Sequence, residues 1–357
     1  MSARITQRDV ARKAGVSHVT VSLALRGHHG IPEKTRKRIE EIAREIGYVP
    51  DPMLASLSAY RMSCRPAAYQ SNIAWISDCS KSEELYQTFS HNYYKGAAER
   101  ARELGYNLEG VRLEEVNDNP VQLERMLSAK GISGLLLGPS RSLGGKRCTK
   151  ELRMNLSHFS AVRFGHSYRY PVLNTVANAQ FRTALMTMHH ITQLGYRRIG
   201  IVLTHRLDER TDWNFLGGFR SGQDLVARGD RLEPFYIDGE VNMRKVVSWI
   251  TKYKIECIID VSYSMYDHLT AFGIDIPDEV GYANMDLIFG RHISGMDQNS
   301  LRIGVVAVDL LVGMMQRGEQ GIPEVPLYLN VDSSWNVGTT AVQLNNRTVK
   351  RRARRGM

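Results

Sequence analysis

The sequence predicts two parts, a small all-α head at the N-terminus and an α/β core of two doubly wound parallel-sheet subdomains. Residues 1–47 contain three short segments with helical spacing of apolar residues. From residue 72, short apolar runs alternate with longer amphipathic segments, which is typical of parallel strands joined by crossover helices. This alternating series occurs twice, with a boundary near 171–176, and so indicates two subdomains of similar design.

Length and composition exclude several classes of protein. A chain of 357 residues with 43% hydrophobic and 24% charged residues suits two or three globular units and excludes wholesale disorder. No apolar run approaches the ~18 residues needed to span a bilayer, and the polar start predicts no signal peptide. Widely separated cysteines predict reduced thiols in a cytoplasm, with neither a disulfide framework nor a zinc site. The cysteines are Cys64, Cys79, Cys148 and Cys257.

The positive charge lies at the two ends of the chain. Residues 1–65 hold 12 basic and 6 acidic residues, and residues 345–357 hold 6 basic and no acidic ones. Residues 66–344, with 29 basic and 31 acidic residues, are close to neutral. A basic module at the N-terminus favours a polyanionic partner, although solvated surface charge is the alternative explanation. The basic tail is expected to be disordered.

Three helices are expected in the head. The first begins after Thr6, whose hydroxyl is placed to cap it, and ends at Gly15, where the chain must turn sharply. Ser17 is placed to cap a second helix over 18–25, and a third helix is expected over 33–46. Two helices joined by a glycine turn and braced by a third form a helix-turn-helix module, whose second helix enters the major groove of DNA. The expected core positions are Val10, Ala11, Ala14, Val21, Ala24, Leu25, Ile39, Ile42, Ala43 and Ile46.

An ordered set of motifs covers the first 55 residues or so. They are D-V-A-x-x-A-G-V-S-x-x-T-V-S, then T-R-x-x-I, then G-Y-x-P. On these motifs the segment resembles the DNA-binding head of the lac repressor (LacI/GalR) family. The resemblance implies a sequence-specific, DNA-binding transcriptional regulator, with a repressor favoured, that acts on double-stranded operator DNA.

The resemblance and the positions in the head together assign the DNA-contacting residues. His18 and Val19 open the second helix, where the family reads base edges, and the short hydroxyl side chains suit phosphate oxygens. Leu23 departs from the family, in which many members have a polar, base-contacting residue at this position. The operator sequence of this protein therefore cannot be inferred from that of a relative. The expected DNA-binding residues are Thr6, Ser17, His18, Val19, Thr20, Ser22, Leu23, Arg26, Thr35, Leu57 and Ser58.

Residues 48–70 are expected to form a hinge helix and linker. The stretch carries apolar side chains without a core to bury them, and Asp51 and Pro52 suit the start of a helix. The family resemblance implies a hinge helix that orders on DNA, with Leu57 at the position of the leucine that wedges into the minor groove and kinks the duplex. An ordinary flexible linker is the alternative.

The core resembles the periplasmic-binding-protein-like core of the same family. The matching pieces are LGYRRIGIV, the LGGF turn, PDEV with its following strand and aspartate, and MDQN at 296–299. Strands are expected at 72–78, 107–113, 132–138, 159–165, 197–203, 234–238, 256–261 and 278–284. Helices are expected at 91–104, 120–130, 178–194, 214–228, 242–253 and 265–272. The expected units are a head (1–47), a hinge (48–70), a core (71–342) and a tail (343–357), with the first core subdomain over about 71–172 and 298–328 and the second over about 173–297 and 329–342.

A small effector is expected in the cleft between the subdomains, at the carboxyl ends of the strands. The resemblance implies that the aromatic candidates stack on the ligand and that two aspartates, Asp260 and Asp286, accept hydrogen bonds from its hydroxyls or amine, so a sugar, a nucleoside and a small amine all remain open. Phe215 stands where the family commonly has an effector-gripping arginine, and Arg163 stands where it often has an aspartate. The candidates are Asp78, Phe89, Arg163, Phe164, Arg210, Thr211, Asp260 and Asp286.

Catalysis is not expected. The sequence contains neither a G-x-S-x-G nor an H-E-x-x-H motif, and no glycine-rich phosphate loop follows a strand, so no cofactor or metal is expected. The tail lacks leucine heptads, which predicts a homodimer on a pseudo-palindromic operator. A small-molecule sensor with a vestigial DNA-binding head is the alternative from another functional class.

Overall fold

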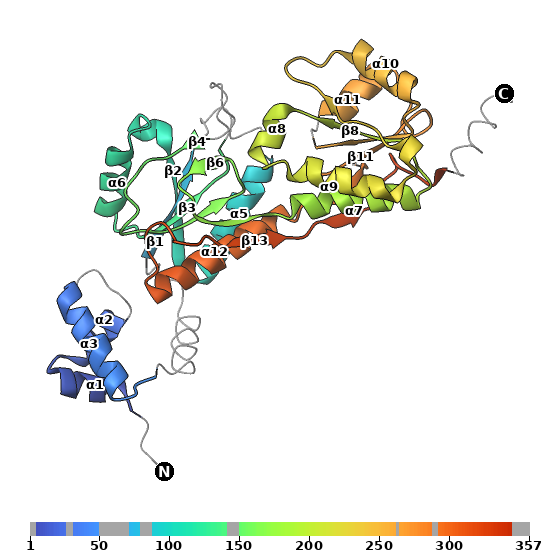
Figure 1. The fold of residues 1–357 in the computed structure, drawn as a ribbon. Coiled ribbons are helices and arrows are strands. Elements are labelled where there is room, and N and C mark those ends of the chain that lie inside the picture. The colour runs from blue at the N-terminus through green and yellow to red at the C-terminus, as the bar shows by residue number, and fades with distance from the viewer. Residues whose placement is uncertain are drawn as a thin grey trace.

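A computed structural model describes the chain over residues 5–25, 31–49, 71–78, 88–140, 150–261, 264–287 and 292–344 (Figure 1). Over these residues, none of the helices combines the length and apolar character of a membrane span. The predicted hinge helix, the basic tail, and Arg26, Leu57 and Ser58 lie outside the described residues.

The head consists of three helices around one small core, as predicted. The helices are α1 (Gln7–Ala14), α2 (His18–Leu25) and α3 (Glu33–Glu45). All ten predicted core positions pack together, with Val10, Val21, Ala24 and Ile39 fully buried. Because this core uses only one side of α2, the opposite side of that helix faces outward.

Local hydrogen bonds hold the turn between α1 and α2. Gly15 adopts a left-handed conformation with φ 66°, which glycine tolerates without strain. The Ser17 hydroxyl accepts the Thr20 N–H at 3.0 Å and so caps α2, as predicted. At the start of α1, the Asp9 carboxylate accepts from both the N–H (2.9 Å) and the hydroxyl (2.7 Å) of Thr6. The guanidinium of Arg38, on α3, donates to the carbonyl of Ala14 at 2.7 Å and ties α3 to the end of α1.

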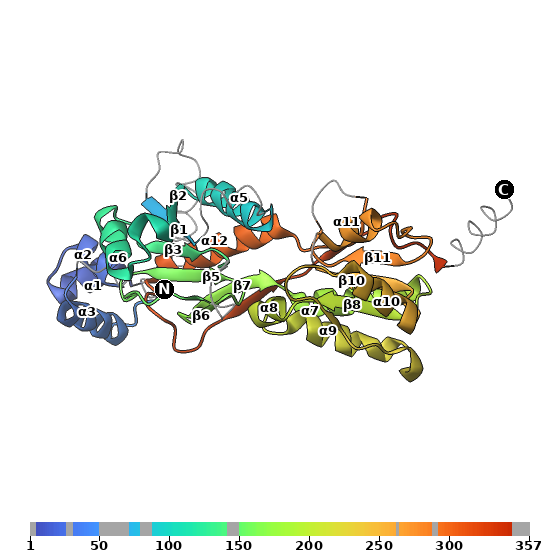
Figure 2. The same cartoon turned by 90° about the horizontal axis from the view of Figure 1, so that it is seen from above.

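The core contains two six-stranded sheets, one in each subdomain (Figures 1 and 2). The first has the order β13-β7-β5-β3-β1-β2 and is parallel throughout. Its strands are β1 (Ser71–Ser77), β2 (Tyr106–Arg112), β3 (Gly134–Leu137), β5 (Ser160–Phe164), β7 (Asn174–Asn178) and β13 (Tyr328–Val331). A small pair, β4 (Lys150–Glu151) and β6 (Tyr168–Tyr170), lies beside it.

The second sheet has the order β14-β12-β11-β10-β8-β9, with only β14 antiparallel. Its strands are β8 (Ile199–Leu203), β9 (Phe235–Tyr236), β10 (Cys257–Asp260), β11 (Gly281–Asn284), β12 (Ser294–Asp297) and β14 (Ser334–Asn336). This doubly wound design in both subdomains confirms the predicted fold class.

Helices cover both faces of each sheet. The first sheet carries α5 (Thr88–Glu103), α6 (Pro120–Ala129), α12 (Ser300–Arg317) and a 3-10 turn, η2 (Leu113–Val116). The second carries α7 (Gln180–Gln193), α8 (His205–Arg210), α9 (Asn214–Gly222), α10 (Met243–Tyr253), α11 (Ser264–Ala271) and two 3-10 turns, η3 (Gln223–Leu225) and η4 (Arg228–Asp230). Along β1, Ile73 and Trp75 pack towards α5 and α12, whereas Ala74 and Ile76 pack towards α6.

The chain passes between the subdomains at three places, and two of them differ from the expected boundaries. Strand β7 pairs with β5 and β13 in the first sheet, so the first crossing follows Asn178 rather than residue 172. Strand β13 also belongs to the first sheet, so the last crossing follows Val331 rather than residue 328. The second crossing, between β12 and α12, lies close to the expected boundary at 297 and 298.

Because α5 and α12 pack closely, adding one methyl group at Gly304 is expected to destabilise the protein strongly. A Cβ added at Gly304 would lie 2.1 Å from the carbonyl oxygen of Tyr93, which backbone atoms do not tolerate. We expect Gly304→Ala to lower the free energy of unfolding by about 1–3 kcal/mol, because the two helices must move apart. Urea denaturation followed by circular dichroism measures this loss. Gly110→Ala, whose Cβ would enter open space, is the matched control; equal stability of the two variants would contradict the prediction.

Candidate functional sites

The outward side of α2 presents the predicted base-reading residues. His18 and Val19 are both exposed, Val19 to 64%, and neither belongs to the head core. Ser22 and Leu23 are half-buried on the same short helix. The side chains at the start of α2 are therefore free to contact a ligand without loss of packing.

The hydroxyl side chains of the head divide into two groups. Ser17 and Thr20 share the cap of α2, with their hydroxyl oxygens 2.8 Å apart, and Thr6 is engaged with Asp9. Thr35 is half-buried in the first turn of α3. Capping and phosphate contact are compatible, because a hydroxyl both donates and accepts.

One wall of the expected cleft lies at the carboxyl ends of β1 and β3. Asp78 directly follows β1, and its carboxylate accepts a hydrogen bond from the Ser140 hydroxyl. The Ser140 N–H donates to the hydroxyl of Ser167 at 2.9 Å. Ser140 and Ser167 are buried and were not predicted, although both lie just beyond strand ends, as Asp78 does.

An aromatic cluster lies next to this wall. Phe164 is fully buried, stacked on Tyr93 with ring centroids 5.4 Å apart and tilted against Trp75 at 4.9 Å. Phe164 therefore packs against Tyr93 and has no solvent-exposed surface that a ligand could contact. Phe89 lies in the first turn of α5, and its side chain is outside what the structure describes.

Charges on the second subdomain face Tyr93. Burial raises the pKa of the Tyr93 phenol, the Asp286 carboxylate raises it further, and the Arg210 guanidinium opposes both. Tyr93 belongs to the first subdomain, whereas Arg210 ends α8 and Asp286 follows β11 in the second. These electrostatic effects therefore act between the two subdomains. Tyr93 was missed by sequence reasoning because it lies inside a helix rather than after a strand.

Two other predicted residues are already engaged within the protein. Asp260 is buried and accepts a hydrogen bond from the Tyr282 hydroxyl at 3.1 Å. Burial and the Asp260 charge together raise the pKa of Tyr282 well above its ordinary value. The Thr211 hydroxyl donates to the carbonyl of Leu207 at 2.8 Å, which closes the end of α8.

The Arg163 side chain is used for hydrogen bonds within the first subdomain. It is buried, and its guanidinium donates to the Thr175 hydroxyl at 2.8 Å and to the Tyr168 carbonyl at 2.6 Å. Burial lowers its pKa, and Asp212 of the second subdomain opposes that effect. Arg163 thus ties β5 to β6 and β7 beside the cleft instead of projecting into it.

The turn between α8 and α9 was also missed. Asp212 and Trp213 both have left-handed backbones, with φ 51° and 54°, and the Trp213 side chain is 53% exposed. Two successive non-glycine residues in this region store strain, a feature that concentrates at functional sites. Burial and Arg163 lower the pKa of His166, and Asp212 opposes them, so this turn faces the first subdomain.

The first and third crossings are joined by hydrogen bonds. The Asn178 amide donates to the Val331 carbonyl (3.1 Å) and to the Ser333 hydroxyl (2.8 Å), and the Thr183 hydroxyl bonds both Asn178 and Ser333. Asn299, on the second crossing, donates to the Asp332 carbonyl at 2.8 Å. All three connections are therefore linked at one place.

A metal site is not indicated by the described side chains, among which no three His, Cys, Asp or Glu residues gather in a way that suits an ion.

Comparisons with known proteins agree with these features. The family model described as "Bacterial regulatory proteins, lacI family" matches residues 6–51. The transcriptional repressor CytR of Escherichia coli K12 is 52% identical over 247 residues, covering 62% of this chain and 67% of that protein. The regulator IdnR of the same organism is 32% identical over 124 residues, covering 31% of this chain and 37% of its own length. The repressor PurR of Aliivibrio salmonicida is 22% identical over 335 residues, covering 86% and 91%.

Solved structures share the fold. The lac repressor dimer bound to operator and the anti-inducer ONPF matches with a TM-score of 0.55 and 15% identity, covering 95% of this chain and all of that one. The regulator CelR in complex with cellobiose gives 0.53 and 18% identity over 94% of this chain and all of its own. A regulator from Rhizobium etli gives 0.59 and 15% identity over 76% and 99%.

Proposed function

The chain belongs to the lacI family of bacterial regulatory proteins, and on that basis we propose that it represses transcription by binding an operator under the control of a small molecule held between its core subdomains. The observation that carries the proposal is the arrangement of α2 in the head. Ser17 caps this helix and its inner side packs in the head core, while His18 and Val19 are exposed to solvent and lie outside that core. A surface built in this way suits the major groove.

The effector we infer is a polyhydroxylated small molecule with one flat face. Asp286 offers a carboxylate and Arg210 a guanidinium from one side of the cleft, and the Asp78–Ser140 pair offers hydroxyl-binding groups from the other. The exposed ring of Trp213 suits a flat face. Cellobiose, ribose and glucose are bound in three structures of similar fold, which supports a sugar.

Control of DNA binding follows from the position of the cleft. We infer a homodimer in the cytoplasm, with one head on each half of a pseudo-palindromic operator. A ligand that binds one arrangement of the two subdomains more tightly shifts the population towards it. Because both subdomains pivot at the linked crossings, this shift is passed to residues 48–70 and so to the spacing of the heads. In this proposal Leu57 acts as the minor-groove wedge.

Two experiments test the proposal. Selection of operators from random duplex DNA with the full-length protein is expected to return a pseudo-palindromic sequence. Thermal-shift screening with sugars and nucleosides is expected to return at least one stabilising compound that also changes operator affinity. A stabilising compound without any selected operator would instead support a small-molecule sensor whose head is vestigial.

Operator binding is expected to be strongly electrostatic. A dimer with two basic heads contacts several phosphates, so the logarithm of the affinity should fall with the logarithm of the salt concentration with a slope of about −5 or steeper. Fluorescence anisotropy over a salt series measures this slope. Deleting residues 345–357 makes the slope shallower if the basic tail touches DNA, whereas an unchanged slope shows that it does not.

A further inference from the structure

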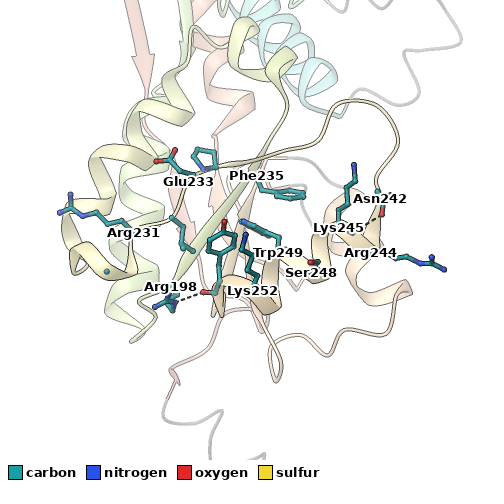
Figure 3. Close-up of a pocket in the computed structure, with 14 residues that line it drawn as sticks. Arg198, Arg231, Glu233, Phe235, Asn242, Arg244, Lys245, Ser248, Trp249 and Lys252 are labelled. Carbon is teal, nitrogen blue, oxygen red and sulfur yellow. Dashed lines mark hydrogen bonds between the residues drawn. The ribbon is translucent and has the colours of Figure 1, made fainter.

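A second concave surface lies in the second subdomain, away from the cleft. It is a groove of about 910 Å³ between α10 and the segment 229–235 (Figure 3). The floor is aromatic: Phe235, on the edge strand β9, packs against Trp249 with ring centroids 4.8 Å apart. Trp249 is fixed in turn, since a Cβ at Gly200 would lie only 2.4 Å from its ring. The floor is therefore a rigid apolar surface.

The walls of the groove carry a surplus of positive charge. Arg198 and Arg231 are held by Asp230 (3.1 Å) and Asp224 (2.8 Å). Within the described part of the chain, Lys245 and Lys252 have no carboxylate partner, and both are exposed. Lys245 also lies in the first turn of α10, where a cation is unfavourable beside the positive end of the helix dipole and where this helix has no acidic residue. An anion in the groove would relieve this repulsion.

The spacing of Lys245 and Lys252, the two lysines without a carboxylate partner, indicates the shape of the ligand. The Lys252 ammonium lies over the Tyr253 ring, 5.0 Å from its centroid. Lys245 and Lys252 are seven residues apart on α10, which is roughly 10 Å along the helix axis. Trp249 lies between them in the sequence and on the same side of the helix, at the groove floor (Figure 3). A ligand that satisfies this arrangement needs two anionic groups separated by an apolar group.

We propose that this groove binds an extended acidic segment of a partner protein. In an extended chain, alternate side chains point to the same face, so an acidic–x–apolar–x–acidic segment places its carboxylates roughly 13 Å apart. The flexible lysine side chains accommodate the difference of about 3 Å. The apolar side chain between the carboxylates then lies on Phe235 and Trp249.

Duplex DNA fits this surface less well than an acidic peptide. A phosphate backbone has no apolar group to cover the aromatic floor formed by Phe235 and Trp249. The groove lies in the second subdomain, whereas the DNA-binding head is joined in sequence to the first subdomain. The basic tail of this protein, residues 345–357, is excluded by its charge.

The experiment uses the full-length protein and a fluorescent peptide in which glutamate, leucine and glutamate occupy alternate positions, with serines between them. Fluorescence anisotropy at low salt is expected to show binding that weakens as salt is added. The double variant Lys245→Glu/Lys252→Glu is expected to bind at least about tenfold more weakly. Lys254→Glu, also exposed and at the same end of α10 as Lys252, lies outside the groove and is expected to bind as the parent does.

Three results would overturn the proposal. The first is equal binding of a control peptide with lysines in place of the glutamates. The second is unchanged affinity in the double variant. The third is loss of affinity for operator-free duplex DNA in that variant, which would assign the groove to phosphates. The double variant is also tested for operator affinity and effector response, which are expected to be unchanged. If they are unchanged, a failure of peptide binding counts against the groove alone and not against the proposed repressor function.

Discussion

Asp286→Ala is expected to remove the effector response and to leave operator binding by the effector-free protein unchanged. The carboxylate lies close enough to Tyr93 to raise the pKa of its phenol, and it belongs to the opposite subdomain. A ligand that joins the two subdomains therefore loses a hydrogen-bond acceptor on a half-buried residue. Such a loss costs about 1–3 kcal/mol, which weakens effector binding by roughly 5- to 150-fold.

Calorimetric titration of an effector found by screening measures this loss. Asp224→Ala is a suitable control, since Asp224 is an exposed aspartate of the same subdomain that pairs with Arg231 outside the cleft. Asp260→Ala is a less informative variant, because it also leaves the buried Tyr282 hydroxyl without the acceptor it has now and so lowers stability. A normal response in the Asp286 variant would show that the effector binds elsewhere.

The sequence indicated where the cleft is but not which side chains face it. Strand ends are readable as the points where apolar runs stop: Asp78 and Asp286 follow strands, and Asp260 is the last residue of one. What each side chain does there depends on partners distant in the sequence. Ser140 reaches Asp78 across 62 residues, and Tyr93 faces a cleft whose other wall begins more than 100 residues later.

The strained turn at Asp212 and Trp213 illustrates a second limit. Left-handed backbone is readable when glycine, asparagine or aspartate occupies the position, so Asp212 carries such a signal and Trp213 does not. The turn is closed by a local hydrogen bond at the end of α8, in which the Trp213 N–H donates to the Asp208 carbonyl at 2.8 Å. A tryptophan at such a position gives no sequence signal for a left-handed backbone.

The fold itself was predicted best where interactions are local. The helices of the head have local boundary signals, such as the turn at Gly15 and the cap by Ser17, and each helix is confirmed. By contrast, α12 was missed because apolar residues run along most of its length and hide the helical period. The helix predicted over 214–228 ends at Gly222, and Gly218 within it serves close packing, since a Cβ there would lie 2.0 Å from the Phe181 carbonyl of α7.

Replacing His18 and Val19 together by alanine is expected to remove specific operator binding while leaving nonspecific DNA binding nearly intact. Both side chains are exposed at the start of α2 and outside the head core, so the fold is not affected, and alanine is favourable in helices. Each lost base contact costs about 1–3 kcal/mol. Phosphate contacts, which dominate nonspecific binding, are expected from other residues of the head.

Anisotropy titrations with the selected operator and with an unrelated duplex of equal length measure the two affinities separately. Glu41→Ala, an exposed change on α3 that faces neither α2 nor the head core, serves as the control for the fold. The expected result is a smaller ratio of specific to nonspecific affinity in the double variant and an unchanged thermal midpoint. If the ratio stays at the parental value, base recognition does not reside at the start of α2, and the hinge residue Leu57 becomes the next position to test.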